Sequence, residues 1–491
     1  MELALERHTT VPIYRQIVNQ VRAQIQDGTL RGGSRLPPVR QLAAECGLTR
    51  LTVHSAYAEL QAEGLVESHV GRGTFVTAGA PTVPPADRPT PPAPWVSQGV
   101  LANLLRWGEH GDLLSFAQAF PAAETYPTEE LGRALQAALT ADGTLGYGHI
   151  QGEPELRAEL ASLLLQRGMS VAPDHVLVTS GAQQGIDVAL RALTEPGDVI
   201  LVEEPVYPGV LELAALRGQR VVGIPNDGGK LRLEVLEAAC SEHAPRLLYL
   251  VPTYNNPTGT SLTRESREAV LRLADTHNFV VLEDDTYGLL GFELSAPAAL
   301  HSLDRNERVV YLTSFSKMLA PALRLGALVA PVSLLPALAA AKQSSDLVCS
   351  ALMQRALAYY LRTGHMATHL SLVRATYQQR RDAMLRALLR HMPRCTWTVP
   401  AGGLSLWVEL PPGIIERDFT ADALRQGIGL APGEAFLARP RPQAAMRLSF
   451  GVHAPERIEA GVAGLGRVLE SHLLRPELIL SLGSGAAGPL V

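Results

Sequence analysis

A proline-rich segment at residues 79–94 is the feature that most constrains how this chain can fold. Seven of its sixteen residues are proline. Because proline fixes φ and lacks a backbone N–H, the segment can join neither a helix nor the interior of a sheet. It is typical of a semi-rigid spacer that reaches about 50 Å when fully extended. The sequence therefore predicts a small domain at 1–77, a linker at 78–99, a large domain at 100–470 and a tail at 471–491.

The composition is that of a folded protein with a sizeable core. Of the 491 residues, 46% are hydrophobic and 19% are charged, which excludes disorder and fibrous repeats for most of the chain. The formal charge of −5 excludes a uniformly basic surface. The longest uncharged stretch, from Leu325 to Ala341, contains two prolines and is too short to span a membrane, so we expect no membrane association.

The cysteines indicate a reducing compartment. They lie far apart in the sequence and lack the spacing of metal ligands, so we expect no disulfide framework and no metal site. The N-terminus also lacks the apolar run of a secretory signal, which favours a cytoplasmic protein. The four cysteines are Cys46, Cys240, Cys349 and Cys395.

The first 77 residues show three helical patterns followed by a hairpin pattern. Apolar residues recur at helical spacing in 14–25, 38–43 and 53–60, and Thr49 is placed to cap the third helix. Two short runs in 65–76 then flank a Gly-Arg-Gly turn, which suits a β-hairpin. Three helices and a hairpin predict a winged helix-turn-helix.

In a winged helix-turn-helix, the start of the third helix enters the major groove of double-stranded DNA. Side chains there, on the preceding helix and in the wing are the candidates for contact with DNA: Arg40, Arg50, Thr52, His54 and Arg72. Residues 12–76 contain seven arginines and five acidic residues, so charge alone gives weak support for DNA binding. On periodicity alone, a three-helix module that binds another protein remains open.

Residues 12–76 resemble the winged-helix domain of GntR-type transcriptional regulators. The family pattern L-P-x-x-R-x-L-A is matched at 36–43, and T/S-R-x-T-V is matched at 49–53. The pattern of E-G followed by G-x-G-T-F-V is matched at 63–76, while Pro38 departs from the usual serine or alanine. The resemblance implies that the partner is an operator in double-stranded DNA and that the contacts are made by Arg40, Arg50, Thr52, His54, Gly71 and Arg72.

In the large domain, short apolar runs alternate with helical stretches. The runs are 176–179, 199–202, 221–224, 247–251, 279–282 and 309–312. This alternation predicts an α/β domain with a mostly parallel sheet covered by helices, in which ligands bind at the carboxyl ends of the strands.

Three of these strand ends carry reactive or ligand-binding residues. The turn SGAQQ (180–184) opens a helix whose first N–H groups can hold a phosphate. The acidic run EDD (283–285) suits either a magnesium ion or a pairing with a ring nitrogen. The sequence SFSK (314–317) ends the third strand with a lysine.

Lys317 is informative because only Lys230, Lys317 and Lys342 supply a side-chain amine. Ser-x-x-Lys is also the nucleophile motif of penicillin-binding enzymes, but these need a Lys-Thr-Gly, and none of the three lysines precedes a threonine. A Schiff base with pyridoxal phosphate needs a carboxylate, a stacking aromatic ring and phosphate donors as well, and all are present at strand ends. Lys230 and Lys342 are expected to be surface lysines.

Residues 112–465 resemble the fold type I aminotransferases, which use pyridoxal 5′-phosphate. Seven motifs occur in the family's order: YGHIQGEPELR (147–157), SGAQQ (180–184), EPVYP (204–208), NNPTG (255–259), D-x-x-Y (284–287), S-x-x-K (314–317) followed by Arg324, and RLSF (447–450). A GntR-type module in front of such a domain resembles the MocR/GabR-type transcriptional regulators.

The resemblance implies a role for each motif residue. Lys317 would bind the cofactor covalently, Asp284 would pair with its pyridinium nitrogen, and Tyr207 would stack on its ring. Asn256 and Tyr287 would hydrogen-bond the ring hydroxyl. The phosphate would be held by Ala182, Gln183, Ser314 and Arg324, with Tyr147 reaching it from a partner subunit. Arg447 would bind the carboxylate of a substrate or effector.

Two departures from the family pattern bear on activity. Ala182 stands where relatives often have a phosphate-binding hydroxyl, and Ala119 stands where many have glycine beside the substrate. We therefore expect a transcriptional regulator whose large domain senses an amino-acid-like effector or pyridoxal phosphate itself. It would act as a homodimer in which each small domain docks on the other chain. The alternative is an active aminotransferase with an appended DNA-binding domain; a domain used only for dimerisation would not need both Lys317 and Asp284.

Overall fold

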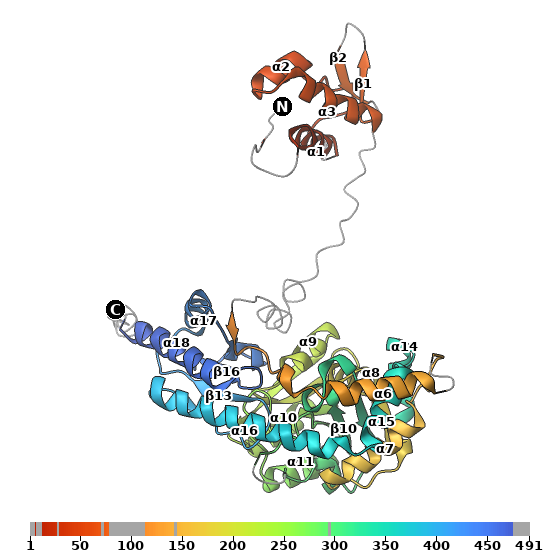
Figure 1. Cartoon of the computed structure of the whole chain (residues 1–491), viewed down its shortest axis with the longest axis vertical. Helices are drawn as coiled ribbons and strands as arrows, with labels where there is room; N and C mark the ends of the chain where they lie inside the picture. The colour runs from red at the N-terminus through yellow and green to blue at the C-terminus, as the bar shows by residue number, and fades with distance from the viewer. Residues whose placement is uncertain are drawn as a thin grey trace, which may run out of the picture. The chain divides into compact units, whose positions relative to one another are not determined.

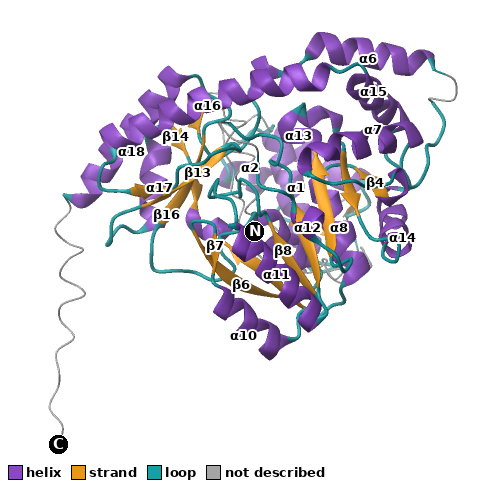
Figure 2. Ribbon diagram, turned by 90° about the horizontal axis from the view of Figure 1, so that it is seen from below, coloured by secondary structure: helices purple, strands orange, loops and turns teal. Residues whose placement is uncertain are grey.

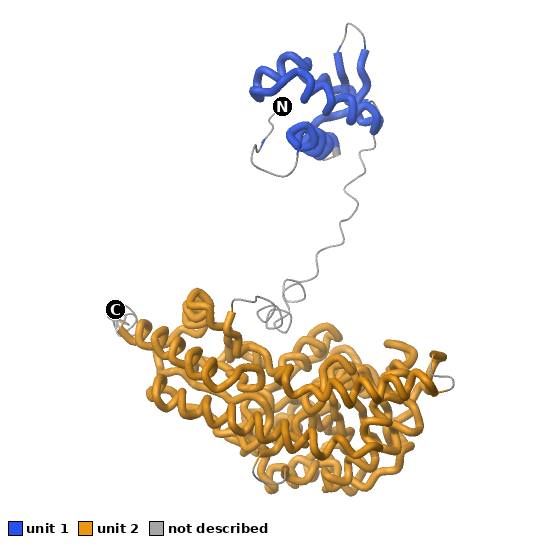
Figure 3. Tube along the Cα trace, in the orientation of Figure 1, with its two compact units in different colours: residues 1–97 blue, residues 98–491 orange. Residues whose placement is uncertain are grey.

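The computed structural model describes Leu5 and residues 12–26, 29–69, 73–77, 113–141, 145–292 and 296–474. The chain divides into two compact units, Met1–Ser97 and Gln98–Val491, which Figure 3 colours separately. The boundary between the units falls inside the predicted linker, whose residues lie outside the described part of the chain.

The small unit is a winged helix-turn-helix, as predicted (Figure 1). Apolar side chains of its three helices, among them Val21, Leu42 and Val53, form a single core that also receives Val76 from the hairpin. Thr49 caps the third helix because its hydroxyl accepts a hydrogen bond of 3.3 Å from the N–H of Thr52. The elements are α1 (Ile13–Gln26), α2 (Val39–Glu45), α3 (Arg50–Ala62), β1 (Val66–His69) and β2 (Gly73–Val76).

The large unit is built on an eight-stranded sheet in the described part of the chain. The strand order is β4-β11-β10-β9-β8-β5-β6-β7, and the strands from β10 to β6 pair in parallel. Each of the six predicted runs coincides with one of these strands, although residues 251 and 279 fall just outside β8 and β9. The strands are β4 (Val176–Thr179), β5 (Val199–Glu204), β6 (Arg220–Asp227), β7 (Lys230–Leu231), β8 (Leu247–Leu250), β9 (Val280–Asp284), β10 (Val309–Ser314) and β11 (Gly326–Val329).

Strand β11 runs antiparallel to both of its neighbours, β10 and β4. The connection from β10 contains only the short helix α13 (Phe315–Met318) and one 3-10 turn. Parallel crossovers need a dozen or more residues, so this short connection turns the chain back along the sheet. The lysine of α13 is thereby held at the carboxyl end of β10.

Helices cover both faces of the sheet (Figure 2). Side chains along a strand point alternately to the two faces, so each face contributes to a separate hydrophobic core beneath its helices. Val199 and Leu201 of β5 face one core, which includes residues of α10 and α11, while Ile200 and Val202 face the other, which includes α8. The helices of this region are α6 (Thr128–Thr140), α7 (Pro154–Leu164), α8 (Ala182–Leu193), α9 (Pro208–Leu216), α10 (Leu233–His243), α11 (Arg264–His277), α12 (Leu300–Leu303), α14 (Leu335–Asp346) and α15 (Ala351–Arg362).

The C-terminal part of the large unit packs a second sheet against long helices. This sheet has the order β12-β13-β16-β15, and a separate parallel pair joins β14 to β3. Helix α18 continues to Leu473, so it crosses the predicted boundary between the large domain and the tail at 470. The elements are β3 (Leu114–Ser115), α16 (His365–His391), β12 (Thr396–Trp397), β13 (Ser405–Glu409), α17 (Glu416–Arg425), β14 (Ile428–Gly429), β15 (Ala431–Pro432), β16 (Ala445–Ser449) and α18 (Pro455–Leu473). Among the described helices, none is both long enough and apolar enough to span a bilayer.

Candidate functional site

A cavity of about 570 Å³ lies where the ends of the central strands meet residues of the C-terminal sheet. It is lined by every residue predicted to contact the cofactor or an effector within one chain: Ala182, Gln183, Tyr207, Asn256, Asp284, Tyr287, Ser314, Lys317, Arg324 and Arg447. Tyr147, predicted to act across a subunit interface, is 89% exposed and lies outside this cavity. Its assignment to a partner's site remains a prediction.

One end of the cavity has the features of an anion site. Gly181 turns the chain into α8 with φ of +92°, a conformation that favours glycine, and the first N–H groups of the helix face the turn. Arg324 reaches this turn from the end of the 3-10 segment, donating from Nη2 to the Ser180 carbonyl at 3.0 Å and from Nη1 to Ser316 Oγ at 3.4 Å. The helix start, the guanidinium and the Ser314 hydroxyl together suit a phosphate.

Asp284 ends β9 and presents a buried carboxylate to the cavity. Tyr249 donates its hydroxyl to Asp284 Oδ2 at 2.8 Å, and the N–H of Thr286 donates to Oδ1 at 3.0 Å. Burial raises the pKa of Asp284, while these two hydrogen bonds oppose that rise. A protonated ring nitrogen would supply the positive charge that such a carboxylate favours.

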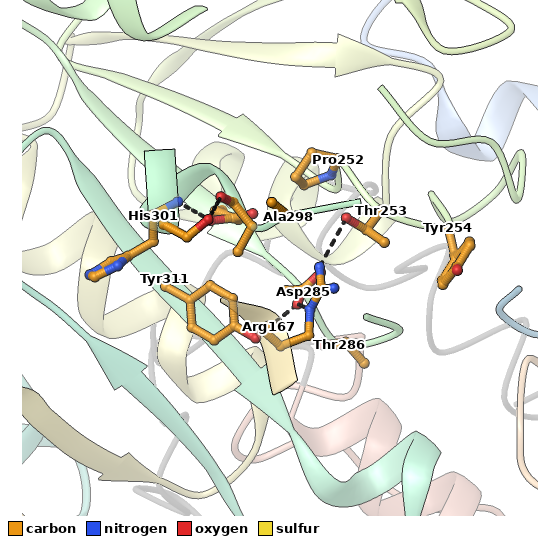
Figure 4. Close-up of polar contacts among 12 residues, drawn as sticks. Arg167, Pro252, Thr253, Tyr254, Asp285, Thr286, Ala298, His301 and Tyr311 are labelled. Atoms are coloured by element: carbon orange, nitrogen blue, oxygen red, sulfur yellow. Dashed lines mark hydrogen bonds and ion pairs between the residues drawn. The ribbon is translucent and has the colours of Figure 1, made fainter. Parts of the chain in front are cut away.

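The neighbouring acidic residue, Asp285, belongs to a buried ion pair behind the site (Figure 4). Arg167 donates from Nε to Asp285 Oδ2 at 2.6 Å and from Nη2 to Oδ1 at 3.1 Å, and Tyr311 donates its hydroxyl to Oδ2 at 2.8 Å. Glu283 accepts from the N–H groups of Leu300 and His301. Only Asp284 of the three acidic residues lines the cavity, which favours the ring-nitrogen interpretation over a magnesium site.

Lys317 lies at the end of α13, with Nζ 4.7 Å from the centre of the Phe120 ring. Burial, together with the charges of Arg447 and Arg324, lowers the pKa of Lys317 to about 7. A large fraction of the amine is therefore neutral near pH 7, which is the form that attacks an aldehyde.

The other two lysines lie elsewhere. Lys230 is exposed on β7, as expected. The prediction of a surface position for Lys342 was wrong, because its side chain is 0% exposed and pairs with Asp346 at 2.8 Å. Asp346 also accepts from Ser180 Oγ at 3.1 Å, so the ion pair is part of the packing beneath the start of α8.

Arg447 extends from β16 into the cavity as a buried cation. Its Nη1 donates to Asn256 Oδ1 at 3.0 Å, its Nη2 donates to the Ala117 carbonyl, and its guanidinium lies 4.9 Å from the Phe436 ring centre. Burial lowers its pKa to about 10, although Tyr287 and Tyr207 oppose that change. In the described part of the chain no acidic side chain pairs with it, and its Nε lacks a partner. A carboxylate ligand would complete this site.

Several residues of the site were not identified from the sequence. Ser316, Thr286 and Phe120 line the cavity, and Tyr249 holds Asp284. Tyr249 lies inside the apolar run 247–251. A buried tyrosine hydroxyl needs a hydrogen-bond partner, and this was the one sequence signal for its contact with Asp284.

The predicted DNA contacts lie on the surface of the small unit. Arg40, Arg50 and His54 are exposed, while Thr52 is partly buried and its hydroxyl lies 2.9 Å from that of Thr49. Leu51, which was not predicted to be functional, is 75% exposed at the start of α3. The wing residues Gly71 and Arg72 lie outside the described residues.

The fold and the two sites define a class of protein: a DNA-binding winged helix joined to a pyridoxal-phosphate domain of aminotransferase fold. Residues 13–76 match the bacterial regulatory proteins of the gntR family, and residues 113–465 match the class I and II aminotransferases. The chain belongs to the family of transcriptional regulators that combine these two domains, and its cofactor is pyridoxal phosphate.

Similar proteins include both regulators and enzymes. The HTH-type transcriptional regulator YisV of Bacillus subtilis is 30% identical over 93% of this chain and 96% of its own. The probable rhizopine catabolism regulatory protein MocR of Rhizobium meliloti is 30% identical over 94% and 95%, respectively. The kynurenine aminotransferase of Pyrococcus horikoshii, solved in complex with PMP, is 33% identical with a TM-score of 0.73 and covers 76% of this chain and 95% of its own.

Proposed function

We propose that the large domain binds a small amino compound, or responds to pyridoxal phosphate itself, and thereby changes how the small domain binds an operator. The observation that carries this proposal is that Arg447, a buried cation with no acidic partner among the described residues, faces the same cavity as Lys317. An amine and a carboxylate on one ligand would engage both ends of that cavity. The ligand would have to bind two arrangements of the protein with different affinity, typically by about 1–3 kcal/mol.

Each lining residue has one task in this proposal. When bound, the cofactor supplies an aldehyde that exchanges reversibly between amines. Lys317 holds it through its amine, and Asp284 keeps the ring nitrogen protonated. Tyr207 packs on the ring, while Asn256 and Tyr287 orient its hydroxyl. Ala182 and Gln183 at the start of α8, together with Ser314 and Arg324, would hold the phosphate.

The proposed assembly is a homodimer in the cytoplasm, where the operator lies. The exposed ring of Tyr147 supports a contact with a second subunit, whose phosphate site it would reach. The linker would let each small domain dock on the other chain's large domain.

The second candidate function is an active aminotransferase. It is favoured by the arrangement of Lys317, Asp284 and Arg447 around one cavity. Ala182 and Ala119 count against efficient turnover, because the first removes a phosphate hydroxyl and the second places a methyl group in the cavity wall.

Footprinting of the DNA upstream of the gene and its neighbours tests the main proposal. We expect protection of an operator whose extent or affinity changes when pyridoxal phosphate or an amine is added. Turnover with an amino donor and a keto acid is measured on the same preparation. Multiple turnovers at ordinary enzyme rates, with protection unchanged by any ligand, would favour the enzyme.

The pH dependence of cofactor capture tests the state of Lys317. Because its pKa is lowered to about 7, the neutral amine becomes more abundant as pH rises to 7 and is nearly complete above 8. The capture rate of apo-protein should therefore rise about fivefold from pH 6 to pH 7, about twofold more by pH 8, and level off above that. Stopped-flow absorbance from pH 6 to about pH 9 measures this, with N-acetyl-lysine as the ordinary amine. A rate still rising at the upper end would contradict the lowered pKa.

Arg50→Ala tests the DNA-binding surface. Arg50 is exposed at the start of α3, so we expect a loss of about 1–3 kcal/mol of discrimination between the operator and unrelated DNA if it contacts a base edge. Fluorescence anisotropy at fixed salt measures both affinities. Arg15→Ala, which removes the same charge from α1, is the control. Equal weakening on both DNAs would make Arg50 a phosphate contact instead.

A further inference from the structure

We infer that the amino compound recognised by this cavity carries one carboxylate and an apolar side chain. This inference rests on the proposed function and concerns the class of effector. Its basis is the segment 117–120, which connects the two ends of the ligand site. The Ala117 carbonyl accepts from Arg447, and the Phe120 ring lies 4.7 Å from Lys317 Nζ. A ligand whose carboxylate meets Arg447, and whose amine would reach the cofactor at the end of Lys317, therefore lies along this segment.

The walls around that position are mainly apolar. Besides the residues that hold the cofactor, the cavity is lined by seven apolar residues and by three uncharged polar ones: Ala117, Ala119, Phe120, Pro208, Val251, Pro321 and Ala322, with Gln118, Thr286 and Ser316. Ala117 is fully buried and Ala119 is 7% exposed, so this side of the wall belongs to the packed core. A hydrocarbon side chain would exchange water for these surfaces, at about 0.8 kcal/mol for each buried CH₂.

The charged residues of the cavity leave no place for a second charge on the ligand. Among the described lining residues they are Asp284, Lys317, Arg324 and Arg447. Asp284 accepts a hydrogen bond from Tyr249 and faces the cofactor ring in the proposed function. Arg324 donates a hydrogen bond to the Ser180 carbonyl, in the turn proposed to hold the phosphate. Lys317 is taken by the cofactor in the proposed function, and Arg447 by the ligand's first carboxylate. A second carboxylate or a distal ammonium would be buried without a partner, which is unfavourable.

Titration of the full-length protein loaded with cofactor tests the inference. Binding is followed by calorimetry and by the absorbance of the cofactor. From alanine through 2-aminobutyrate to norvaline, we expect the affinity to rise about fourfold per added CH₂. Aspartate, glutamate and lysine should bind no more tightly than alanine. Tighter binding of aspartate, glutamate or lysine than of norvaline would overturn the inference while leaving the proposed function in place.

A matched pair of variants at Ala322 makes the test specific to the cavity wall. This residue is exposed in the 3-10 turn at 321–323, so substitution there does not disturb the core. Ala322→Arg adds a cation to the wall and should raise glutamate affinity about threefold to fivefold, whereas Ala322→Gln, of similar length but neutral, should not. Equal effects of both variants would count against the inference. If no amine of any class changes the cofactor's absorbance or releases heat, the inference fails together with the amine-sensing form of the proposed function, which leaves pyridoxal phosphate itself as the signal.

Discussion

Lys317→Ala is expected to abolish covalent attachment of pyridoxal phosphate while the protein remains folded. Lys317 is the one lysine that lines the cavity, and its lowered pKa of about 7 makes the amine reactive near neutral pH. Borohydride reduction of the wild-type protein with cofactor should add the mass of one cofactor per chain. The variant should show no added mass and no cofactor absorbance after dialysis.

Lys230→Ala is the matched control, because it removes an exposed amine from β7 and should leave trapping unchanged. Circular dichroism of both variants should match the wild type. Trapping that persists in Lys317→Ala would move the attachment to one of the other two lysines. Peptide mapping would identify which, although the burial of Lys342 and its ion pair with Asp346 leave its amine little access to an aldehyde.

The strands of the large sheet could be predicted because their signal is local. Runs such as 176–179 and 309–312 are buried on both faces, so most of their residues are apolar, and polar residues follow at the strand end. The parallel arrangement brings these ends together. For this reason Ala182, Asp284 and Lys317 could be expected at one site without knowledge of any contact, whereas Tyr207, Asn256 and Arg324 were added by the resemblance to aminotransferases.

What could not be predicted depends on contacts between distant parts of the chain. Arg167 lies in a short 3-10 turn with no pattern of its own, and its partner Asp285 is 118 residues away. The helix of Lys342 is rich in alanine and looks exposed, yet its lysine is buried against Asp346, itself hydrogen-bonded to Ser180. The antiparallel direction of β11 depends on the short connection from β10, and not on any pattern in the residues of the strand itself.

The contact between Arg167 and Asp285 leads to the second large effect. The two side chains are 2% and 0% exposed, and they share two hydrogen bonds while Tyr311 donates a third to the same carboxylate. In Arg167→Ala the carboxylate would stay buried without its cation. We expect the free energy of unfolding of the large domain to fall by about 3–5 kcal/mol. Urea unfolding followed by circular dichroism measures this.

Arg264→Ala is the control, because Arg264 forms an exposed ion pair with Glu268 whose loss should cost less than about 0.5 kcal/mol. The double variant Arg167→Ala with Asp285→Asn distinguishes two contributions to the loss of stability, the unpaired buried charge and the lost contacts. It has no unpaired carboxylate, so it should regain the part of the stability that the charge accounts for. A double variant as unstable as Arg167→Ala would show that packing, and not charge, holds this region.

Because Asp285 directly follows Asp284, Arg167→Ala should also weaken cofactor binding, whereas Arg264→Ala should not. The ion pair would then keep Asp284, the carboxylate proposed to pair with the ring nitrogen of the cofactor, in position, although neither Arg167 nor Asp285 lines the cavity.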